Sequence, residues 1–154
     1  MSASRERRWL LTGGGGQLAT ALEPLLDGEI FVAREEALDL RDGRAVAAVV
    51  RGFEPDIVLH TAAFTDVDGA ERDEATAYAV NALGTRHLVE AVRGTHTQVV
   101  SFSTDYVFDG AKGAPYVEHD EPDPLGAYGR TKLAQEHETL AWVHGTVIRT
   151  AWLF

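Results

Sequence analysis

The chain has 154 residues, 45% of them hydrophobic, which is enough for one domain with a sizeable core. Its formal net charge of −10 argues against general binding to nucleic acid or to anionic membranes, but it leaves open a local phosphate site built from backbone N–H groups. The absence of cysteine excludes disulfides and thiolate metal sites, and no apolar run approaches the length of a membrane span. We therefore expect a single domain over residues 1–154 that is soluble and cytoplasmic, without a signal peptide at its polar N-terminus.

The organising stretch is an apolar run followed by four glycines and a helix-forming segment. Residues 8–12 predict a strand and residues 17–26 a helix. Gly13, Gly16 and Ala19 fit the spacing G-x-x-G-x-x-[G/A], in which glycines allow a tight turn and let a pyrophosphate approach the backbone at a helix N-terminus. Because glycine runs are also common in plain turns, phosphate binding and a simple turn both remain open for this stretch alone.

Strand-like and helix-like segments alternate along the rest of the chain. We expect further strands at 30–33, 57–61, 98–104 and 146–150, and helices at 43–51 (capped by Asp42), 68–93 and 128–142. This alternation predicts an α/β fold with a doubly wound parallel sheet, that is, a Rossmann-like NAD(P)-binding domain. Residues 105–127 form a long irregular connection, and loops of that length in a compact domain are usually functional.

Arg34 directly follows the second predicted strand, where a dinucleotide fold meets the adenosine ribose. An acidic residue there suits a free 2′-hydroxyl, whereas an arginine suits a 2′-phosphate. Arg34 therefore favours NADP(H) over NAD(H), with a solvated arginine as the alternative.

Asp66, Asp68 and Glu71 lie close together but lack the ligand set of a calcium loop, so we expect no metal site. Residues 68–71 fit a capping box that opens the helix expected at 68–93. Asn81 falls inside that helix, where asparagine is mildly unfavourable. It is either a surface residue or one that bonds to backbone or water.

Three residues could carry chemistry on a carbonyl group. Thr104 ends a predicted strand, at the edge where open α/β sheets bind ligands. Tyr128 and Lys132 are four residues apart on one helix face, and a nearby ammonium is expected to lower the pKa of the phenol. Such a phenol exchanges a proton with a carbonyl oxygen that Thr104 could hold, and the lysine could also reach the ribose of a nicotinamide cofactor. Tyr-x-x-x-Lys alone is common on ordinary helices; the glycine turn, hydroxyl strand end and Tyr–Lys helix in this order are more selective.

With these motifs in place, the chain resembles the extended short-chain dehydrogenase/reductases, and within them the dTDP-4-dehydrorhamnose reductase family, including the dihydrostreptose synthase type. The run STDYVFDG at 103–110 is the most specific feature. The other stretches that carry the resemblance are TGGGGQL at 12–18, DIVLHTAAFTDVD at 56–68, PLGAYGRTKLA at 124–134 and RTAWLF at 149–154.

The resemblance implies NAD(P)H-dependent reduction of the 4-keto group of a dTDP-4-dehydro-6-deoxy-L-hexose, giving dTDP-L-rhamnose or a close relative. It implies that Tyr128 donates the proton, that Lys132 is its partner and a cofactor ligand, and that Thr104 holds the carbonyl. The residues expected around NADP(H), or NAD(H) as the alternative, are Gly13, Gly16, Gln17, Leu18, Arg34, Asp39, Leu40, Ala62, Ala63, Phe64, Thr65, Phe102, Tyr128 and Lys132. Those expected to face the dTDP-sugar are Thr104, Asp105 and Trp152.

Members of that family continue far beyond the position of Trp152, so we expect the C-terminal substrate-binding part to be missing here. A chain that ends at Phe154 is then expected to bind cofactor with weak or absent turnover, and its open sheet edge is expected to favour a homodimer. Two alternatives remain: a non-catalytic dinucleotide-binding or regulatory subunit, and a nucleotide-sugar epimerase or dehydratase. A phosphate-only nucleotidase is disfavoured because the sequence has no P-loop Gly-Lys-Ser/Thr.

Overall fold

A computed structural model describes residues 5–152 of the chain, so the first four residues and the last two of the RTAWLF stretch lie outside it. Its centre is one parallel sheet with the strand order β2-β1-β3-β4-β5. The strands are β1 (Arg8–Thr12), β2 (Glu29–Ala33), β3 (Ile57–His60), β4 (Gln98–Thr104) and β5 (Gly145–Thr150). Each strand lies within a residue or two of its expected position, and the predicted Rossmann-like α/β sheet is confirmed.

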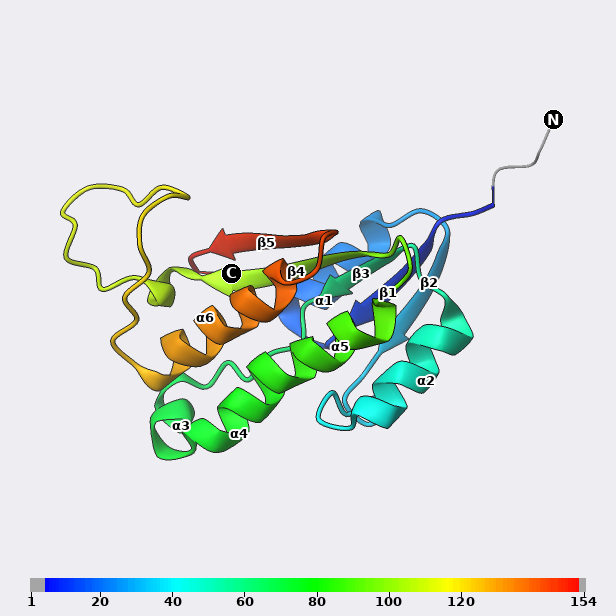
Figure 1. Ribbon diagram of the computed structural model, residues 1–154, viewed down its shortest axis with the longest axis horizontal. Helices are drawn as coiled ribbons and strands as arrows, with labels where there is room; N and C mark the ends of the chain where they lie inside the picture. The colour runs from blue at the N-terminus through cyan, green and yellow to red at the C-terminus, as the bar shows by residue number, and fades with distance from the viewer. Residues whose placement is uncertain (1–4, 153–154) are drawn as a thin grey trace.

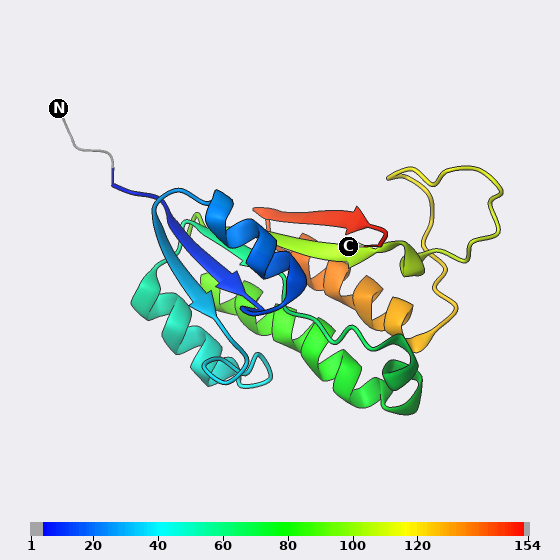
Figure 2. The same cartoon turned by 180° about the vertical axis from the view of Figure 1, so that it is seen from behind.

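Helices cover both faces of the sheet, as a doubly wound fold requires. In Figure 1, α2 (Gly43–Phe53), α5 (Gly84–Val92) and α6 (Ala127–Leu140) lie side by side across one face. Figure 2 shows α1 (Gln17–Leu22) on the opposite face, over β1 and its neighbours. No helix within residues 5–152 is both long and apolar enough to cross a membrane.

Two of the three apolar clusters within residues 5–152 cover the sheet, one on each side, and the third packs Ala70, Ala77 and Ala127 together at the start of α6. Leu10, Val58 and Leu88, all fully buried, belong to the cluster beneath α2 and α5. Leu11, Ala19 and Leu59 form the centre of the other cluster, beneath α1. Successive residues of a strand point to opposite faces, so the unbroken apolar run Leu10–Leu11 supplies both clusters, as expected of a parallel strand covered on both sides.

The first predicted helix is shorter than expected. It ends at Leu22 and continues as a 3₁₀ turn over Glu23–Leu25. Pro24 lies in that turn, and because proline has no backbone N–H it cannot continue the α-helical bonding pattern.

The single helix expected over 68–93 is wrong, and so is its capping box. The segment is divided into α3 (Val67–Arg72), α4 (Glu74–Tyr78), a π-helical turn (Ala79–Leu83) and α5. Asp66, and not Asp68, caps α3 by accepting from the backbone N–H of Gly69 at 2.8 Å. Asp73 has non-helical backbone angles and caps α4. Glu71 instead accepts from the N–H of Ala127 at 2.6 Å, so it holds the start of α6.

Candidate active site

A cavity of about 660 Å³ opens at the carboxyl edge of the sheet. In the sheet, β2 lies on one side of β1 and β3 on the other. The connection from β1 to β2 and the connection from β3 to β4 therefore run in opposite directions. Open α/β sheets bind ligands at this kind of switch point. The cavity lies there and continues across the end of β4 to the start of α6.

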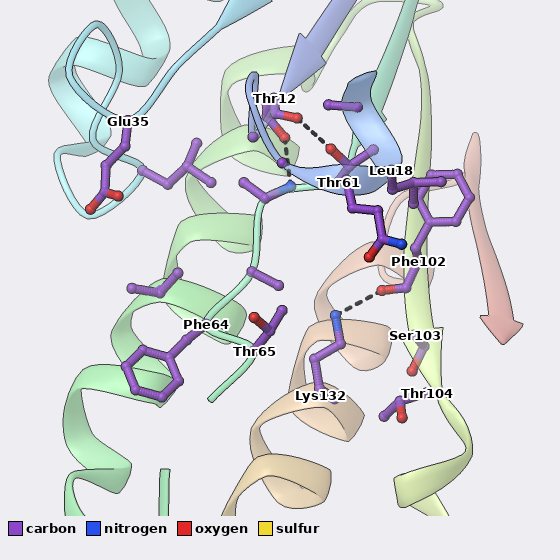
Figure 3. A pocket seen from close by; sticks show the side chains of 18 of the residues that line it. Thr12, Leu18, Glu35, Thr61, Phe64, Thr65, Phe102, Ser103, Thr104 and Lys132 are labelled. Carbon is purple, nitrogen blue, oxygen red and sulfur yellow. Dashed lines mark hydrogen bonds between the residues drawn. The ribbon is translucent and has the colours of Figure 1, made fainter. Parts of the chain in front are cut away.

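The glycine turn forms one wall of the cavity. Gly13 has φ +72°, and a Cβ atom on it would lie 2.7 Å from the backbone nitrogen of Ala62. The Gly16 N–H donates to the Gly13 carbonyl at 2.9 Å, which closes the turn directly before α1. Thr61 and Ala62 in turn hydrogen-bond Thr12, so the loops after β1 and β3 are fastened together (Figure 3).

We expect Gly13→Ala to destabilise the chain by about 1–3 kcal/mol, because alanine is strained at this φ and its methyl group collides with Ala62. Urea unfolding measures the change. The matched control is Gly52→Ala within α2, where nothing lies within 4 Å of an added Cβ and alanine is the better helix former. Equal free energies of unfolding for the two variants would contradict the conclusion that the turn requires glycine at position 13.

Charged residues that follow β2 line one end of the cavity. Glu35, Asp39 and Arg41 line it, and Asp39 pairs with Arg41 at 2.8 Å. The hydrogen bond from Arg41 lowers the pKa of the Asp39 carboxyl. Arg34 does not line the cavity itself; its guanidinium Nη1 lies 2.9 Å from the position of a Cβ on Gly15, so its side chain lies along the outer side of the glycine turn.

A buried histidine connects the glycine turn to α5. His60 is fully buried, and its two ring nitrogens each lie 2.8 Å from a hydroxyl, those of Thr12 and Thr85. Thr85 donates its single hydroxyl proton to the Asn81 carbonyl, so it must accept from His60 Nε2–H, and Thr12 then donates to Nδ1. Burial, and secondarily the charge of Lys132, lower the pKa of His60 to about 3. The ring is therefore neutral and its tautomer is fixed.

Asn81 bonds to the backbone, as one of its two predicted roles required. Its carboxamide accepts from the Phe64 N–H at 2.8 Å and donates to the Phe64 carbonyl at 3.3 Å. It also donates to the hydroxyl of Thr131 on α6 at 3.0 Å. The π-helical turn that carries Asn81 thus joins the cavity wall at Phe64 to the helix of Tyr128 and Lys132, and such turns are frequent at functional sites.

Lys132 is almost completely buried at the floor of the cavity. Its ammonium donates to the Phe102 carbonyl at 2.7 Å (Figure 3). It also donates to the side-chain carbonyl of Gln135. An ammonium has three donors, so one N–H remains for a group in the cavity that Lys132 lines. Burial lowers the pKa of Lys132 to about 7, and the negative charge of Glu136 partly opposes this.

The expected lowering of the Tyr128 pKa is wrong: the pKa is raised. Burial of the phenol is the main cause, the Thr104 hydroxyl acts in the opposite direction, and the charge of Asp105 raises the pKa further. The Lys132 ammonium is held by Phe102 and Gln135 and brings no lowering to the phenol. A phenol with a raised pKa keeps its proton at neutral pH, which suits a proton donor.

The predicted site residues come together around this one cavity, with Arg34 beside it. The lining includes Gly13, Gly16, Gln17, Leu18, Asp39, Leu40, Ala62, Ala63, Phe64, Thr65, Phe102, Thr104, Asp105, Tyr128, Lys132 and Trp152. Sequence reasoning missed Glu35, Arg41, Ser103 and Tyr106, which also line it. Glu35 could have been found from its position next to Arg34. Tyr106, whose ring meets that of Tyr128 edge to face at 5.6 Å, lies in the STDYVFDG run.

Residues 7–154 match the family model described as the RmlD substrate binding domain. The chain belongs to the dTDP-4-dehydrorhamnose reductase family. Within residues 5–152 no group of three or more His, Cys, Asp or Glu side chains could hold a metal ion.

Curated relatives in the dTDP-4-dehydrorhamnose reductase family cover nearly the whole chain. The dTDP-4-dehydrorhamnose reductase of Streptomyces griseus is 42% identical over an alignment of 159 residues, gaps included, that covers 100% of this chain and 52% of the relative. The enzyme of the same name from Mycobacterium tuberculosis (strain CDC 1551 / Oshkosh) is 42% identical over an alignment of 160 residues, gaps included, that covers 99% of this chain and 52% of the relative. The chain thus spans about half the length of the curated relatives it matches.

A solved structure in the same family has the same fold. The crystal structure of dTDP-4-dehydrorhamnose reductase from Bacillus anthracis in complex with NADP superposes with a TM-score of 0.93 at 34% identity, covering 100% of this chain and 56% of that one. The likeness extends from the sheet to the edge where the cavity lies.

Proposed function

We propose that this chain is the cofactor-binding and proton-donating part of an NADP(H)-dependent ketoreductase that reduces the 4-keto group of a dTDP-4-dehydro-6-deoxy-L-hexose. The observation that carries the proposal is the single cavity that the glycine turn, Thr104, Tyr128 and Lys132 line together. The names of the relatives from S. griseus and M. tuberculosis support the substrate class, and the NADP in the B. anthracis structure supports the cofactor.

The residues present fit a dinucleotide. Any side chain at Gly13 would fill the space beside Ala62, and Gly16, the N-cap residue directly before α1, has no side chain to cap the helix. A diphosphate could therefore approach the backbone of this turn. The remaining N–H of Lys132 fits a ribose hydroxyl. When bound, the reduced nicotinamide supplies the hydride.

The protein supplies the proton and holds the carbonyl group. Tyr128 gives its phenolic proton to the oxygen that becomes the new hydroxyl group, and its raised pKa keeps that proton in place until then. Thr104 at present donates to Asp105 Oδ1 at 3.1 Å, so its hydroxyl must turn from Asp105 to hold the substrate oxygen. Lys132, whose ammonium is held by Phe102 and Gln135, has one N–H left with which to hold the cofactor in this cavity.

Arg34 is proposed to bind the 2′-phosphate of NADP(H). We expect Arg34→Met to weaken NADPH binding about 10- to 100-fold and to change NADH binding by no more than about twofold, because a charge-assisted hydrogen bond contributes about 1.5–3 kcal/mol. Calorimetric titration with both cofactors measures this. Arg93→Met, at the exposed C-terminal end of α5, is the control. Equal losses for NADPH and NADH would remove the assignment.

The test of the reaction is sugar-dependent oxidation of NADPH, followed by its absorbance. We expect weak oxidation with a dTDP-4-keto-6-deoxyhexose and none without it. A chain that binds NADPH but never oxidises it would support the alternative of a non-catalytic dinucleotide-binding subunit. Conversion of the sugar without net use of NADPH would support an epimerase or dehydratase.

A further inference from the structure

A buried carboxylate lies on α6, one helical turn after Lys132. Glu136 is only 2% exposed. Its Oε1 accepts from the Ser103 hydroxyl at 2.5 Å and from Arg149 Nε at 2.8 Å, and its Oε2 accepts from Arg149 Nη2 at 2.6 Å. The proposed reaction gives this carboxylate no role.

The partners of Glu136 come from the strands that end at the site. Ser103 directly precedes Thr104 on β4, and Arg149 lies on β5. The ring of Phe108 covers the Arg149 guanidinium at 4.9 Å and limits its contact with water. One carboxylate therefore joins the helix of Tyr128 and Lys132 to the strand of Thr104 and to its neighbour.

A buried ion pair is an inefficient way to add stability, because both charges lose their hydration; an apolar contact of the same size often stabilises a fold as well or better. The charged pair contributes directional hydrogen bonds. The two parallel N–H···O bonds from Arg149 and the bond from the Ser103 hydroxyl can all form in only one position of α6 along β4. An apolar contact is not directional and would allow several positions of the helix.

We propose that Glu136 is a positioning residue, whose buried carboxylate fixes the helix carrying Tyr128 and Lys132 against the strand carrying Thr104 and places a negative charge beside Lys132. The inference rests on the proposed function, because those three residues are the ones that function uses.

The charges around Lys132 single out this carboxylate. On α6, Gln135 is neutral and Glu136 is the carboxylate whose charge raises the pKa of Lys132. From β3, His60 faces Lys132 as a neutral ring, since burial keeps its pKa near 3. From β4, the Phe102 carbonyl is a dipole, and from β5, Arg149 is paired with Glu136 itself. Tyr128 and Asp105 lie at the cavity side, Tyr128 with its proton retained.

The chain allows a direct test because it contains two lysines, Lys112 and Lys132. In protein labelled with ¹³C,¹⁵N-lysine, the side-chain NMR signals give both titration curves without any cofactor. In the wild type we expect the Lys132 midpoint far below that of an ordinary lysine, near pH 7. Glu136→Gln should lower it further by roughly one pH unit, because an adjacent opposite charge favours the ammonium. The Lys112 midpoint is the internal reference.

The matched control is Glu138→Gln on the same helix, whose carboxylate pairs with Arg86 at 2.6 Å nearer the surface. It removes the same charge from α6 and should leave the Lys132 midpoint in place. A purely structural role for Glu136 would lower the melting temperature without moving the Lys132 midpoint, and an unchanged midpoint would overturn the proposal.

A second variant covers the case in which Glu136→Gln does not fold. Arg149→Gln leaves the carboxylate without its cation, at a side chain that is 26% exposed, and should raise the Lys132 midpoint. An unchanged or lowered midpoint would again overturn the proposal. Because these titrations need no NADPH, their outcome is independent of the proposed function. Failure of the proposed function would appear as absent NADPH binding by a protein whose Lys132 midpoints shift as expected here.

Discussion

Tyr128→Phe is expected to lower sugar-dependent NADPH oxidation by about 10²- to 10⁴-fold, the usual contribution of a positioned proton donor. The variant loses only the phenolic oxygen, and the ring still meets Tyr106 edge to face. NADPH affinity should therefore change by no more than about threefold, and the loss should appear in kcat. Steady-state kinetics and calorimetry on the same preparation separate the two effects.

Tyr78→Phe, on α4, is the control for Tyr128→Phe. Tyr78 is 39% exposed and does not line the cavity. It should leave both kcat and NADPH affinity unchanged. If Tyr128→Phe reduced the sugar as fast as the wild type, another group would have to supply the proton and the proposed chemistry would fail.

The second large effect expected is a loss of stability in acid that originates at His60. Its pKa is about 3 in the folded chain and 6.5 in its unperturbed state, so between these values the unfolded chain binds one more proton. Stability therefore rises with pH through this window, and its contribution is complete above pH 6.5 and lost as the pH falls toward 3. The shift corresponds to about 4–5 kcal/mol at most.

Urea unfolding at several pH values isolates this contribution when the wild type is compared with His60→Gln. The glutamine of the variant does not titrate. We expect the variant to be less stable than the wild type at pH 7 by about 1–3 kcal/mol, because the Thr12 and Thr85 hydroxyls lose their hydrogen bonds to the imidazole ring. The difference should shrink as the pH falls below 6.5. His119→Gln, at an exposed histidine, is the control variant. A constant gap between wild type and His60→Gln would show that His60 is not held neutral.

The sheet was predictable because its signals are local. Continuous apolar runs such as residues 57–59 mark strands buried on both faces, and Asp42 bonds the N–H groups of Arg44 and Ala45 as its position before an alanine-rich segment predicts. The helix error between residues 66 and 93 has the opposite cause. Asp66, Asp68 and Asp73 could each cap a helix, because aspartate is a favoured N-cap residue. Asp66 and Asp73 do so in the folded chain, where Glu71 bonds the N–H of Ala127 at the start of α6 and does not complete a capping box with Asp68.

The site was predictable in its members but less so in its electrostatics. Motif spacing leads to Thr104, Tyr128 and Lys132 without any coordinates. The direction of the Tyr128 pKa could not be predicted, because it depends on burial and on where the Lys132 ammonium is held. Glu136 was missed for the same reason: a glutamate on a helix is usually solvated, and Ser103 and Arg149 become its partners only when β4 and β5 pair.

The most direct test of the central claim is the intermolecular nuclear Overhauser effect between NADPH and the tyrosine rings of this 16.7 kDa chain. The account predicts contacts from the nicotinamide protons to the ring signal that disappears in Tyr128→Phe, and none to the ring of Tyr78. Nicotinamide contacts to Tyr78 instead, or no saturable change with millimolar NADPH, would contradict the placement of the cofactor between the glycine turn and α6.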